Sequence, residues 1–343
     1  MSGRMQWTKS VALACACACV LGAAGAASAG VKSLIAGLRN GDEMRYTFSL
    51  HAEESTMVKD KPGVGTQTVN TETVGVLIRV KAETTALDIV EVVYESFHIT
   101  MDSPLGKLDL DLGGTPPDGT AAPLAHELYD KLHGLVGLVI TLNIAPGSGE
   151  ISTMHGGEEL LKAPGAPVFR RYVDPDLFRT TWGDVFQLKS NSMMPPPGDP
   201  WYVKAPILAY GRAGKTSVWE TRKVETVLAD IATIKGEVRA TGNPEDAGTA
   251  AVFFKSISSD CIYKWDTFRS RLLSATRNEA ISTRSERGNI MYDSDLLAKS
   301  TLEFVPPGSV KPKTPAPKPT ETPKPAAPPT PAQAPAPDGK PAP

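Results

Sequence analysis

The sequence has 343 residues, of which 41% are hydrophobic, with 36 basic and 38 acidic side chains and a formal net charge of −2. This balance lacks the basic excess of proteins that bind nucleic acid, so we expect no nucleic-acid partner. The chain is long enough to bury a sizeable hydrophobic core.

Residues 1–29 have the pattern of a secretory signal peptide. Arg4 and Lys9 precede an uncharged, alanine-rich stretch, and Ala27-Ser28-Ala29 places small residues at the −3 and −1 positions of a cut before Gly30. The uncharged stretch is short for a transmembrane helix. We therefore expect export to the periplasm or the extracellular space, and a mature chain that begins at Gly30.

Cysteine usage fits this expectation. Cys15, Cys17 and Cys19 belong to the signal peptide, so cleavage leaves Cys261 as the one thiol of the mature chain. One thiol cannot form an internal disulfide. Cys261 lies in an apparent strand, and we expect it to be buried and structural. An uncleaved anchor and a lipid on Cys19 are the two alternatives for the N-terminus.

The folded body is expected at residues 30–305, where apolar and polar residues alternate with a period of two. Such alternation is typical of antiparallel sheets with one covered face. It predicts a mainly β fold, with a long antiparallel curved sheet or half-barrel. The predicted strands lie at 44–50, 74–80, 97–101, 108–112, 138–144, 216–228, 231–241, 250–258, 261–268 and 299–305.

Two or three helices are expected beside the sheet. Residues 123–136 and 174–188 have apolar residues at helical spacing, and 156–161 form a short helical turn. Asp174 is a suitable N-cap for the second helix because Pro175 follows it at the first turn. We expect loops elsewhere in this part of the chain, including 163–174.

A faint internal repeat leaves open two related half-sheets. Gly41-Asp42 begins the first strand series and Gly198-Asp199 begins the second. A weak internal boundary falls near 190–200, at three consecutive prolines.

Residues 306–343 are expected to be a disordered proline-rich tail. They contain 15 of the 30 prolines and five lysines against Glu321 and Asp338. This composition cannot bury a core and favours extended or polyproline II conformations. The tail is interpreted as a solvated spacer, with a tether to an acidic envelope polymer as the alternative.

A phosphate-loop-like segment runs from Ala209 to Thr216, with Gly214-Lys215-Thr216 at its end. A nucleotide-binding loop requires a helix after it. The residues from Ser217 onward alternate like a strand instead. We interpret the segment as a hairpin turn and expect no nucleotide.

Three side chains of the 123–136 helix have a spacing that would suit a metal. His126, Asp130 and His133 stand at i, i+4 and i+7. The leucines of this helix cluster on the opposite side, which predicts a solvated face and no metal ligands.

Acidic pairs occur at Asp109 and Asp111 and at Glu158-Glu159. The aspartates alternate with leucines, so we expect them on the wet face of a strand. The chain has no G-x-S-x-G motif for a nucleophile. We therefore expect no catalytic residues and no cofactor, and a protein that is not an enzyme.

Several short motifs resemble an uncharacterised family of exported bacterial β-rich proteins. They comprise a Gly-Asp-x-Met-x-Tyr strand, a strand pair, an apolar strand with two Gly-Glu motifs after it, and a Tyr-x-Trp-Asp segment: Gly41–Tyr46, 73–101, 138–144, Gly149–Ile151, Gly156–Leu160 and Tyr263–Asp266. The family has no established activity, so the resemblance implies no site residues. At the level of the fold alone, strands wrapped on a few helices are similar to the half-barrels of periplasmic lipoprotein and lipid carriers.

The apolar face of the sheet is the candidate binding site. Long curved strands with aromatic residues would line an apolar concavity for a small apolar molecule or a lipid. The predicted lining is Tyr46, Phe48, Val76, Ile78, Phe97 and Ile99, with Trp201 at the rim. The alternative is that these residues pack on the helices as ordinary core. The protein would then be a structural or interaction protein of the cell envelope, held by its tail.

Overall fold

The computed structural model describes residues 32–59, 61, 63–118, 123–162, 166–189, 193–205, 218–241, 252–287 and 290–309. The cleavage motif Ala27 to Gly30, the phosphate-loop-like segment at 209–216 and most of the tail lie outside these ranges. The expectations about processing, nucleotide and tail therefore stay predictions. The chain divides into two compact units, Met1–Pro307 and Gly308–Pro343.

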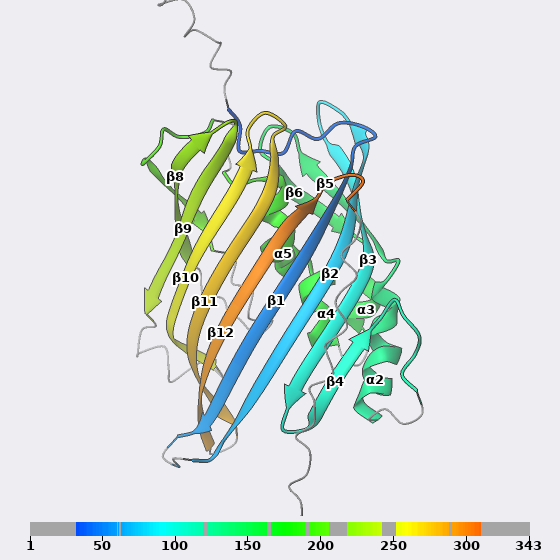
Figure 1. The fold of residues 1–343 in the computed structure, drawn as a ribbon, viewed down its shortest axis with the longest axis vertical. Helices are drawn as coiled ribbons and strands as arrows, with labels where there is room; N and C mark the ends of the chain where they lie inside the picture. Colours follow the sequence, from blue (N-terminus) through cyan, green and yellow to red (C-terminus); the bar gives the residue numbers. More distant parts are fainter. Residues whose placement is uncertain are drawn as a thin grey trace, which may run out of the picture. The chain divides into compact units, whose positions relative to one another are not determined.

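The first unit is built on one open, curved antiparallel sheet of 12 strands (Figure 1). The strand order is β6-β5-β3-β2-β1-β12-β11-β10-β9-β8-β7, and β4 pairs with β3 outside this path. The strands are β1 (Glu43–Val58), β2 (Gly65–Glu83), β3 (Asp88–Ser103), β4 (Gly106–Asp111), β5 (Val139–Ala145), β6 (Glu150–His155), β7 (Pro200–Lys204), β8 (Trp219–Leu228), β9 (Ile231–Thr241), β10 (Val252–Asp266), β11 (Arg271–Arg287) and β12 (Ile290–Val305). The predicted mainly β fold with a curved antiparallel sheet is confirmed.

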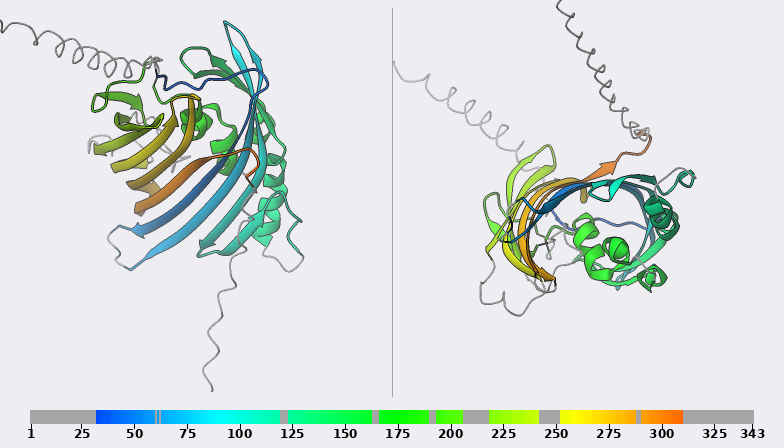
Figure 2. Two further views of the ribbon diagram at one scale, coloured as in Figure 1. Left: turned by 45° about the horizontal axis from the view of Figure 1, so that its top comes forward. Right: turned by 90° about the horizontal axis from the view of Figure 1, so that it is seen from below.

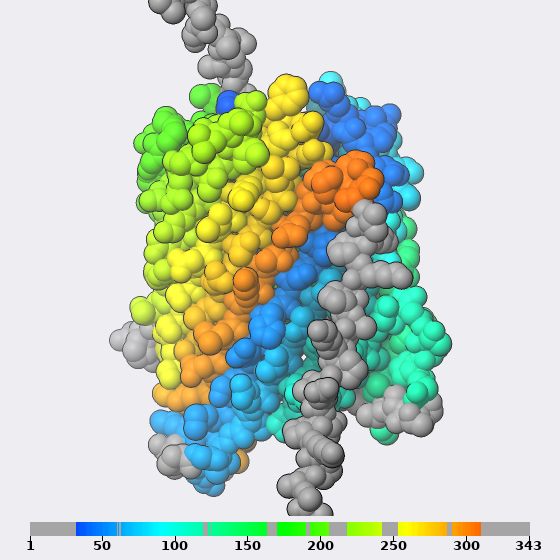
Figure 3. All heavy atoms as spheres, viewed as in Figure 1, coloured from blue at the N-terminus to red at the C-terminus, as the bar shows by residue number. Residues whose placement is uncertain are grey.

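Two meanders make up this sheet, and they meet where β1 pairs with β12 along its length. Gly41-Asp42 therefore leads into a central strand, whereas Gly198-Asp199 leads into β7 at an edge. The two series form one continuous sheet and do not occupy equivalent places in separate half-sheets. Figure 3 shows β1, β12, β11 and β10 side by side on the outer face.

Four α-helices and one 3₁₀ helix are described: α2 (Pro123–Leu132), η1 (His133–Leu135), α3 (Glu158–Lys162), α4 (Ala166–Val173) and α5 (Pro175–Phe186). Asp174 caps α5 as predicted, since its side chain accepts hydrogen bonds from the backbone N–H groups of Asp176 and Leu177. The loop expected at 163–174 was wrong, because α4 occupies most of it. No helix in the described ranges is long and apolar enough to cross a membrane.

The helices α4 and α5 lie inside the curve of the sheet (Figure 2). The side chain of Trp182 on α5 is fully buried, and its ring centroid lies 6.0 Å from that of Phe48 on β1 and 6.5 Å from that of Tyr94 on β3. Alternation along the strands brings their apolar side chains to this concave face, and the amphipathic α5 covers part of it. The main hydrophobic core therefore lies between α5 and the β1–β3 part of the sheet.

The segment before β1 connects the helix layer to the far half of the sheet. Backbone N–H groups of Ala36 and Leu188 donate to Phe186 O and Leu34 O at 2.8 and 2.9 Å. The indole N–H of Trp265 on β10 donates to Ser33 O at 2.9 Å. Leu34 is fully buried by these contacts, and no sequence pattern had assigned this segment a structure.

Both edges of the sheet carry protection against pairing with another strand. On β7, Pro200 lacks an N–H group and Lys204 adds a charge, which are common features of protected edges. On β6, Arg179 of α5 donates to the carbonyl of Ile151 at 3.2 Å.

Candidate functional site

The seven predicted lining residues all lie in the buried core. Tyr46, Phe48, Val76, Ile78, Phe97, Ile99 and Trp201 belong to one hydrophobic cluster, together with residues of α4 and α5. The ring of Phe97 lies 4.7 Å from that of Tyr172, and Trp201 donates its indole N–H to Leu188 O at 3.1 Å. The structure thus brings the seven residues to one face, as the alternation predicts, and places helix side chains against that face.

A belt of buried polar side chains crosses the same concave face next to this core. We define the polar belt as Glu72, Glu220, Arg222, Tyr263, Arg277 and Glu279 of the sheet with Arg171, Tyr172 and Asp184 of the helices. Strand register aligns part of it, because Arg222 pairs with Gly236, Gly236 with Cys261, and Cys261 with Arg277. Every sheet member of the belt is buried.

Two arginines are the centre of the belt. Arg222 donates to Asp184 Oδ1 at 2.9 Å, to Glu220 Oε1 at 3.1 Å and to the hydroxyl of Tyr263 at 2.9 Å. Arg277 donates to the same hydroxyl at 2.8 Å and lies 3.4 Å from Asp184 Oδ2. The Tyr263 hydroxyl donates its own proton to Glu220 Oε1 at 2.8 Å. Each charge therefore has a partner of opposite sign, as burial requires.

A second group in the belt connects α4 to β2. Arg171 Nη1 lies 2.8 Å from Glu72 Oε2, and the hydroxyl of Tyr172 donates to the same oxygen. Asn70 donates its side-chain N–H to Glu72 Oε1 at 2.7 Å. Both helices inside the curve thus contact the sheet through buried charge as well as through apolar packing.

The electrostatics of the belt favour fixed charges over proton transfer. Burial opposes ionisation of Glu220, but Arg222 and Arg277 outweigh it, so the pKa of this carboxyl lies below its ordinary value. Burial raises the pKa of the Tyr263 hydroxyl well above its ordinary value. These shifts keep Glu220 ionised and Tyr263 protonated at neutral pH, which is the behaviour of a structural network.

The thiol of Cys261 lies beside the belt and is buried, as predicted. Burial raises its pKa, although Arg277 donates to the sulfur at 3.1 Å. A reactive cysteine needs a lowered pKa and access to solvent. This thiol therefore belongs to the core.

Sequence reasoning missed the polar belt, although two signals pointed to it. Glu220-x-Arg222 and Arg277-x-Glu279 occupy the alternating positions that carry apolar residues elsewhere in their strands. Gly236 stands at an inward-facing position of β9, and a Cβ atom there would overlap the carboxylate of Glu220. Charged pairs at the inward-facing positions of two strands, with a glycine on a strand that lies between them, indicate a buried ion network.

A second apolar cluster lies beyond the polar belt on the concave face. It consists of six buried side chains, Val218, Val238, Phe254, Ile257, Ile281 and Leu296. The partly buried apolar neighbours are Ala52, Ala205 and Ala240. Among the helix side chains that the structure describes, none belongs to this cluster, so it differs from the main core.

The other predicted sites have solvated or local roles. Asp109 and Asp111 are exposed, and Asp109 pairs with His98 at 2.7 Å. His133 contacts the carbonyl of Tyr129 through Nδ1 at 3.0 Å. Within the described ranges, no group of three or more potential ligands is arranged to hold a metal ion. The pKa of Glu158 is lowered, chiefly because its carboxylate accepts the backbone N–H of Gly156.

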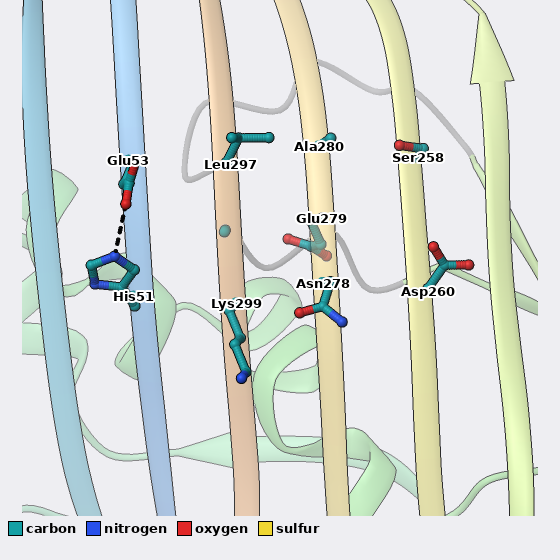
Figure 4. A pocket seen from close by; sticks show the side chains of 10 residues that line it. His51, Glu53, Ser258, Asp260, Asn278, Glu279, Ala280, Leu297 and Lys299 are labelled. Atoms are coloured by element: carbon teal, nitrogen blue, oxygen red, sulfur yellow. Dashed lines mark hydrogen bonds and ion pairs between the residues drawn. The ribbon is translucent and has the colours of Figure 1, made fainter.

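A shallow groove of about 340 Å³ lies across β1, β12, β11 and β10 (Figure 4). Its polar lining includes a His51–Glu53 pair at 3.2 Å, together with Asp260, Asn278 and Lys299. These side chains alternate with those that form the core, so they belong to the outer face. The groove has the mixed charge of an ordinary solvated sheet surface.

No protein-family model matches this chain, and no curated protein matches it. A chain from a structure of lipid–protein interactions in lipovitellin aligns over 78% of this chain and 25% of its own, at 10% identity and a TM-score of 0.44. This chain therefore spans a quarter of the lipovitellin chain that it matches. The outer membrane protein OprG of Pseudomonas aeruginosa aligns over 79% of this chain and 99% of its own, at 9% identity and a TM-score of 0.22.

A third solved structure is DynF, from the dynemicin biosynthesis pathway of Micromonospora chersina, which aligns over 82% of this chain and 93% of its own at 10% identity and a TM-score of 0.18. All three TM-scores are too low for these likenesses to bear on function.

Proposed function

We propose that this chain is an exported, non-enzymatic binding module that holds an apolar or lipid-like ligand on the concave face of its sheet. The proposed contact surface is the second apolar cluster and not the seven residues that the sequence favours. The observation that carries the proposal is the composition of this cluster: five apolar side chains from β9 to β12 and the residue before β8, with no hydrophobic partner among the helix side chains that the structure describes.

The contrast with the main core supports this placement. In the main core, Phe48 and Tyr94 pack on Trp182, so a ligand there would have to replace aromatic contacts that already exist. The six side chains of the second cluster are only 1–6% exposed, so a ligand there would replace contacts that the protein already makes. Such a ligand would keep apolar area out of water, which stabilises by roughly 25 cal/mol per Å². It would also leave the contact between Phe48 and Trp182 of α5 in place.

The polar belt favours a ligand with two ends of different polarity. Glu220 and Val238 point to the concave face beside Val218, so charge and apolar surface adjoin there. A fatty acid or a related amphiphile fits such a boundary better than a pure hydrocarbon does.

The proposal of no catalytic function rests on the belt and on Cys261. The charged groups of the belt are paired with one another, and burial raises the pKa of the thiol. A nucleophile or a general base needs a free reactive atom in reach of a substrate.

A structural or interaction protein of the envelope is the second candidate function. The observation that favours it is the filling of the predicted lining by α4 and α5, because Phe48 and Phe97 contact Trp182 and Tyr172. A filled core is what a structural head on a spacer requires.

One experiment separates the two candidates. Native mass spectrometry of protein purified from its own envelope should show a co-purified lipid, and a fluorescent fatty acid should bind the delipidated protein. Ile281→Ala should weaken this binding, whereas Leu105→Ala, on the exposed β3–β4 turn, should not. If no lipid co-purifies and the fatty acid does not bind, the structural candidate stands.

A further inference from the structure

Three lysines lie close together on the outer face of the sheet, on the neighbouring strands β8, β9 and β10 (Figure 1). Lys223 on β8 stands directly opposite Lys235 on β9. Lys264 on β10 stands opposite Thr233, two residues before Lys235 on the same face of β9. All three lysines alternate with buried residues of their strands, so they point away from the concave face.

These lysines have no counter-ion in the part of the chain that the structure describes. Glu237 and Asp260, which lie on the same outer face, pair with Arg239 at 3.2 and 2.9 Å. Glu225 occupies a bulge of β8 and forms no ion pair with Lys223. Like charges directly opposite each other on two strands are destabilising. The unbalanced positive charge therefore favours an anionic partner.

Two exposed aromatic rings adjoin the lysines on the same face. Trp219 is 61% exposed and Tyr202 is 65% exposed, whereas the other tryptophans that the structure describes are buried. Tyr202 on β7 pairs with Thr221, which lies between Trp219 and Lys223 on the outer face of β8. The tyrosine is therefore a diagonal neighbour of both, within reach of long side chains. Aromatic rings are enriched on binding surfaces. We define the outer patch as Tyr202, Trp219, Lys223, Lys235 and Lys264.

The combination of rings and unpaired lysines suits an acidic polysaccharide. The face of an aromatic ring carries a partial negative charge, so it attracts the C–H groups on the face of a sugar ring. A lysine ammonium group donates charge-assisted hydrogen bonds to a carboxylate. A polymer of sugars in which some rings carry a carboxylate uses both kinds of contact.

Other anionic partners fit the outer patch less well. A bilayer with anionic lipids would also bring Glu237 and Asp260 against its headgroups, because these acidic residues share the outer face. Single-stranded nucleic acid carries a phosphate at every nucleotide, and the net charge of −2 on the whole chain opposes so dense a charge. A polysaccharide with neutral sugars between its acidic ones has a lower charge density, which matches three lysines beside two uncharged rings.

We propose that the outer patch binds an acidic polysaccharide in which carboxylate-bearing sugars alternate with neutral ones. Its two aromatic rings contact the faces of the sugars, and its three lysines pair with the carboxylates. The outer patch lies on the face of the sheet opposite the second apolar cluster, so its test does not depend on the proposed apolar ligand.

The test is calorimetric titration of the mature full chain with hyaluronate oligosaccharides, in which glucuronate alternates with N-acetylglucosamine. The wild type should bind, and added salt should weaken the binding because the lysines are exposed. Lys223→Gln with Lys235→Gln should lower the association constant about tenfold or more, since two charge-assisted contacts are lost. Lys107→Gln is the matched control: the Lys107 side chain is 83% exposed on β4, pairs with Asp102, and should not affect binding.

The aromatic contacts have their own readout. Trp219→Ala should weaken hyaluronate binding severalfold, because a sugar ring loses its stacking surface. Phe268→Ala removes a ring that is 79% exposed on the β10–β11 turn, away from the outer patch, and should leave binding unchanged. In the wild type, hyaluronate should protect Trp219 from quenching by acrylamide.

Several outcomes would overturn the proposal. They are a wild type that does not bind hyaluronate, equal binding of neutral dextran, and a double glutamine variant that binds as the wild type does. Polyglutamate or oligothymidylate that binds as tightly as hyaluronate would also overturn it, because the outer patch would then recognise an acidic peptide or a nucleic acid. The double variant should retain any fatty-acid binding, which separates the two faces of the sheet.

Discussion

The guanidinium of Arg222 on β8 lies 2.9 Å from the carboxylate of Asp184 on α5, and this contact joins the helix layer to the far half of the sheet. Asp184 also lies 3.4 Å from Arg277 on β11. One carboxylate on a helix thus balances two arginines from strands that are not adjacent in the sheet. The position of α5 is therefore fixed by charge on one side and by Trp182 on the other.

The first prediction concerns this carboxylate. Asp184→Ala should lower the free energy of unfolding by about 1–3 kcal/mol, because two buried arginines lose one carboxylate partner and share Glu220 alone between them on that side. Asp176→Ala is the matched control on the same helix: its carboxylate is 93% exposed and pairs with Arg179. An exposed pair of this kind contributes about 0–1 kcal/mol. Urea denaturation of the two variants measures the difference, and equal losses would show that the belt is not a connection between α5 and the sheet.

The second prediction concerns the lining that the sequence favours. Phe48 is buried against Trp182, so Phe48→Ala should cost about 3–5 kcal/mol of stability, as expected for an aromatic residue in a packed core. Leu105→Ala should change stability by less than about 0.5 kcal/mol, since surface substitutions seldom do more. Thermal and urea unfolding test both variants. A stable Phe48→Ala protein that has lost fatty-acid binding would return the ligand to the originally predicted face.

The sequence predicts the sheet well because alternation is a local signal. Met44 to Leu50 and Val74 to Val80 show the same period in the sequence and in the structure, and their apolar residues face the core. It predicts β10 less well. Ser258-Ser259-Asp260 resembles a turn, so the sequence suggests two strands where there is one. Ser259 faces the polar belt beside Cys261, and that neighbour is visible only once the strands pair.

The helix α4 was missed for a similar reason. It has eight residues, with a proline near its start, and such short helices depend on tertiary contacts. Those contacts are to Glu72 on β2, about a hundred residues earlier in the chain. The belt itself needs partners from both meanders and both inner helices. A single sequence indicates which residues of each strand face inward. It does not indicate which strands bring their inward-facing residues next to one another.

The third prediction concerns Gly236. A Cβ atom there would overlap Glu220 and lie 3.1 Å from the Cβ atom of Cys261, so Gly236→Ala should destabilise the protein by displacing the carboxylate from Arg222. Gly183→Ala is the control. Its Cβ atom would meet nothing within 4 Å, and alanine in a helix is favoured over glycine by about 1 kcal/mol. We expect the urea midpoint to fall in Gly236→Ala and to rise in Gly183→Ala, relative to the wild type. A neutral Gly236→Ala would mean that the carboxylate of Glu220 relaxes without cost.

The fourth prediction concerns the dependence of stability on pH. Burial raises the cost of the Glu220 charge, yet Arg222 and Arg277 outweigh it and hold the pKa of the carboxyl below its ordinary value. A group with a lowered pKa in the folded state contributes stability above its unfolded pKa, which for glutamate is about 4.3. This contribution is lost as the pH falls through the folded pKa, so stability should be level near neutral pH and decline in acid. Urea midpoints between pH 7 and pH 3 measure the decline.

Glu220→Gln identifies the residue responsible for part of that decline. The variant should be less stable at pH 7. Its stability should also fall less steeply in acid, because the wild-type protein takes up a proton at Glu220 when it unfolds in acid and a glutamine cannot. Glu159→Gln, at an exposed end of α3, should follow the wild type. Where Glu220→Gln does not fold, the titration of the Glu220 carboxyl carbon in the wild-type protein by NMR gives the same information. A carboxyl that titrates at or above the ordinary glutamate pKa would show that the two arginines do not hold Glu220 ionised, and their charge would then be balanced by Asp184 and not by Glu220.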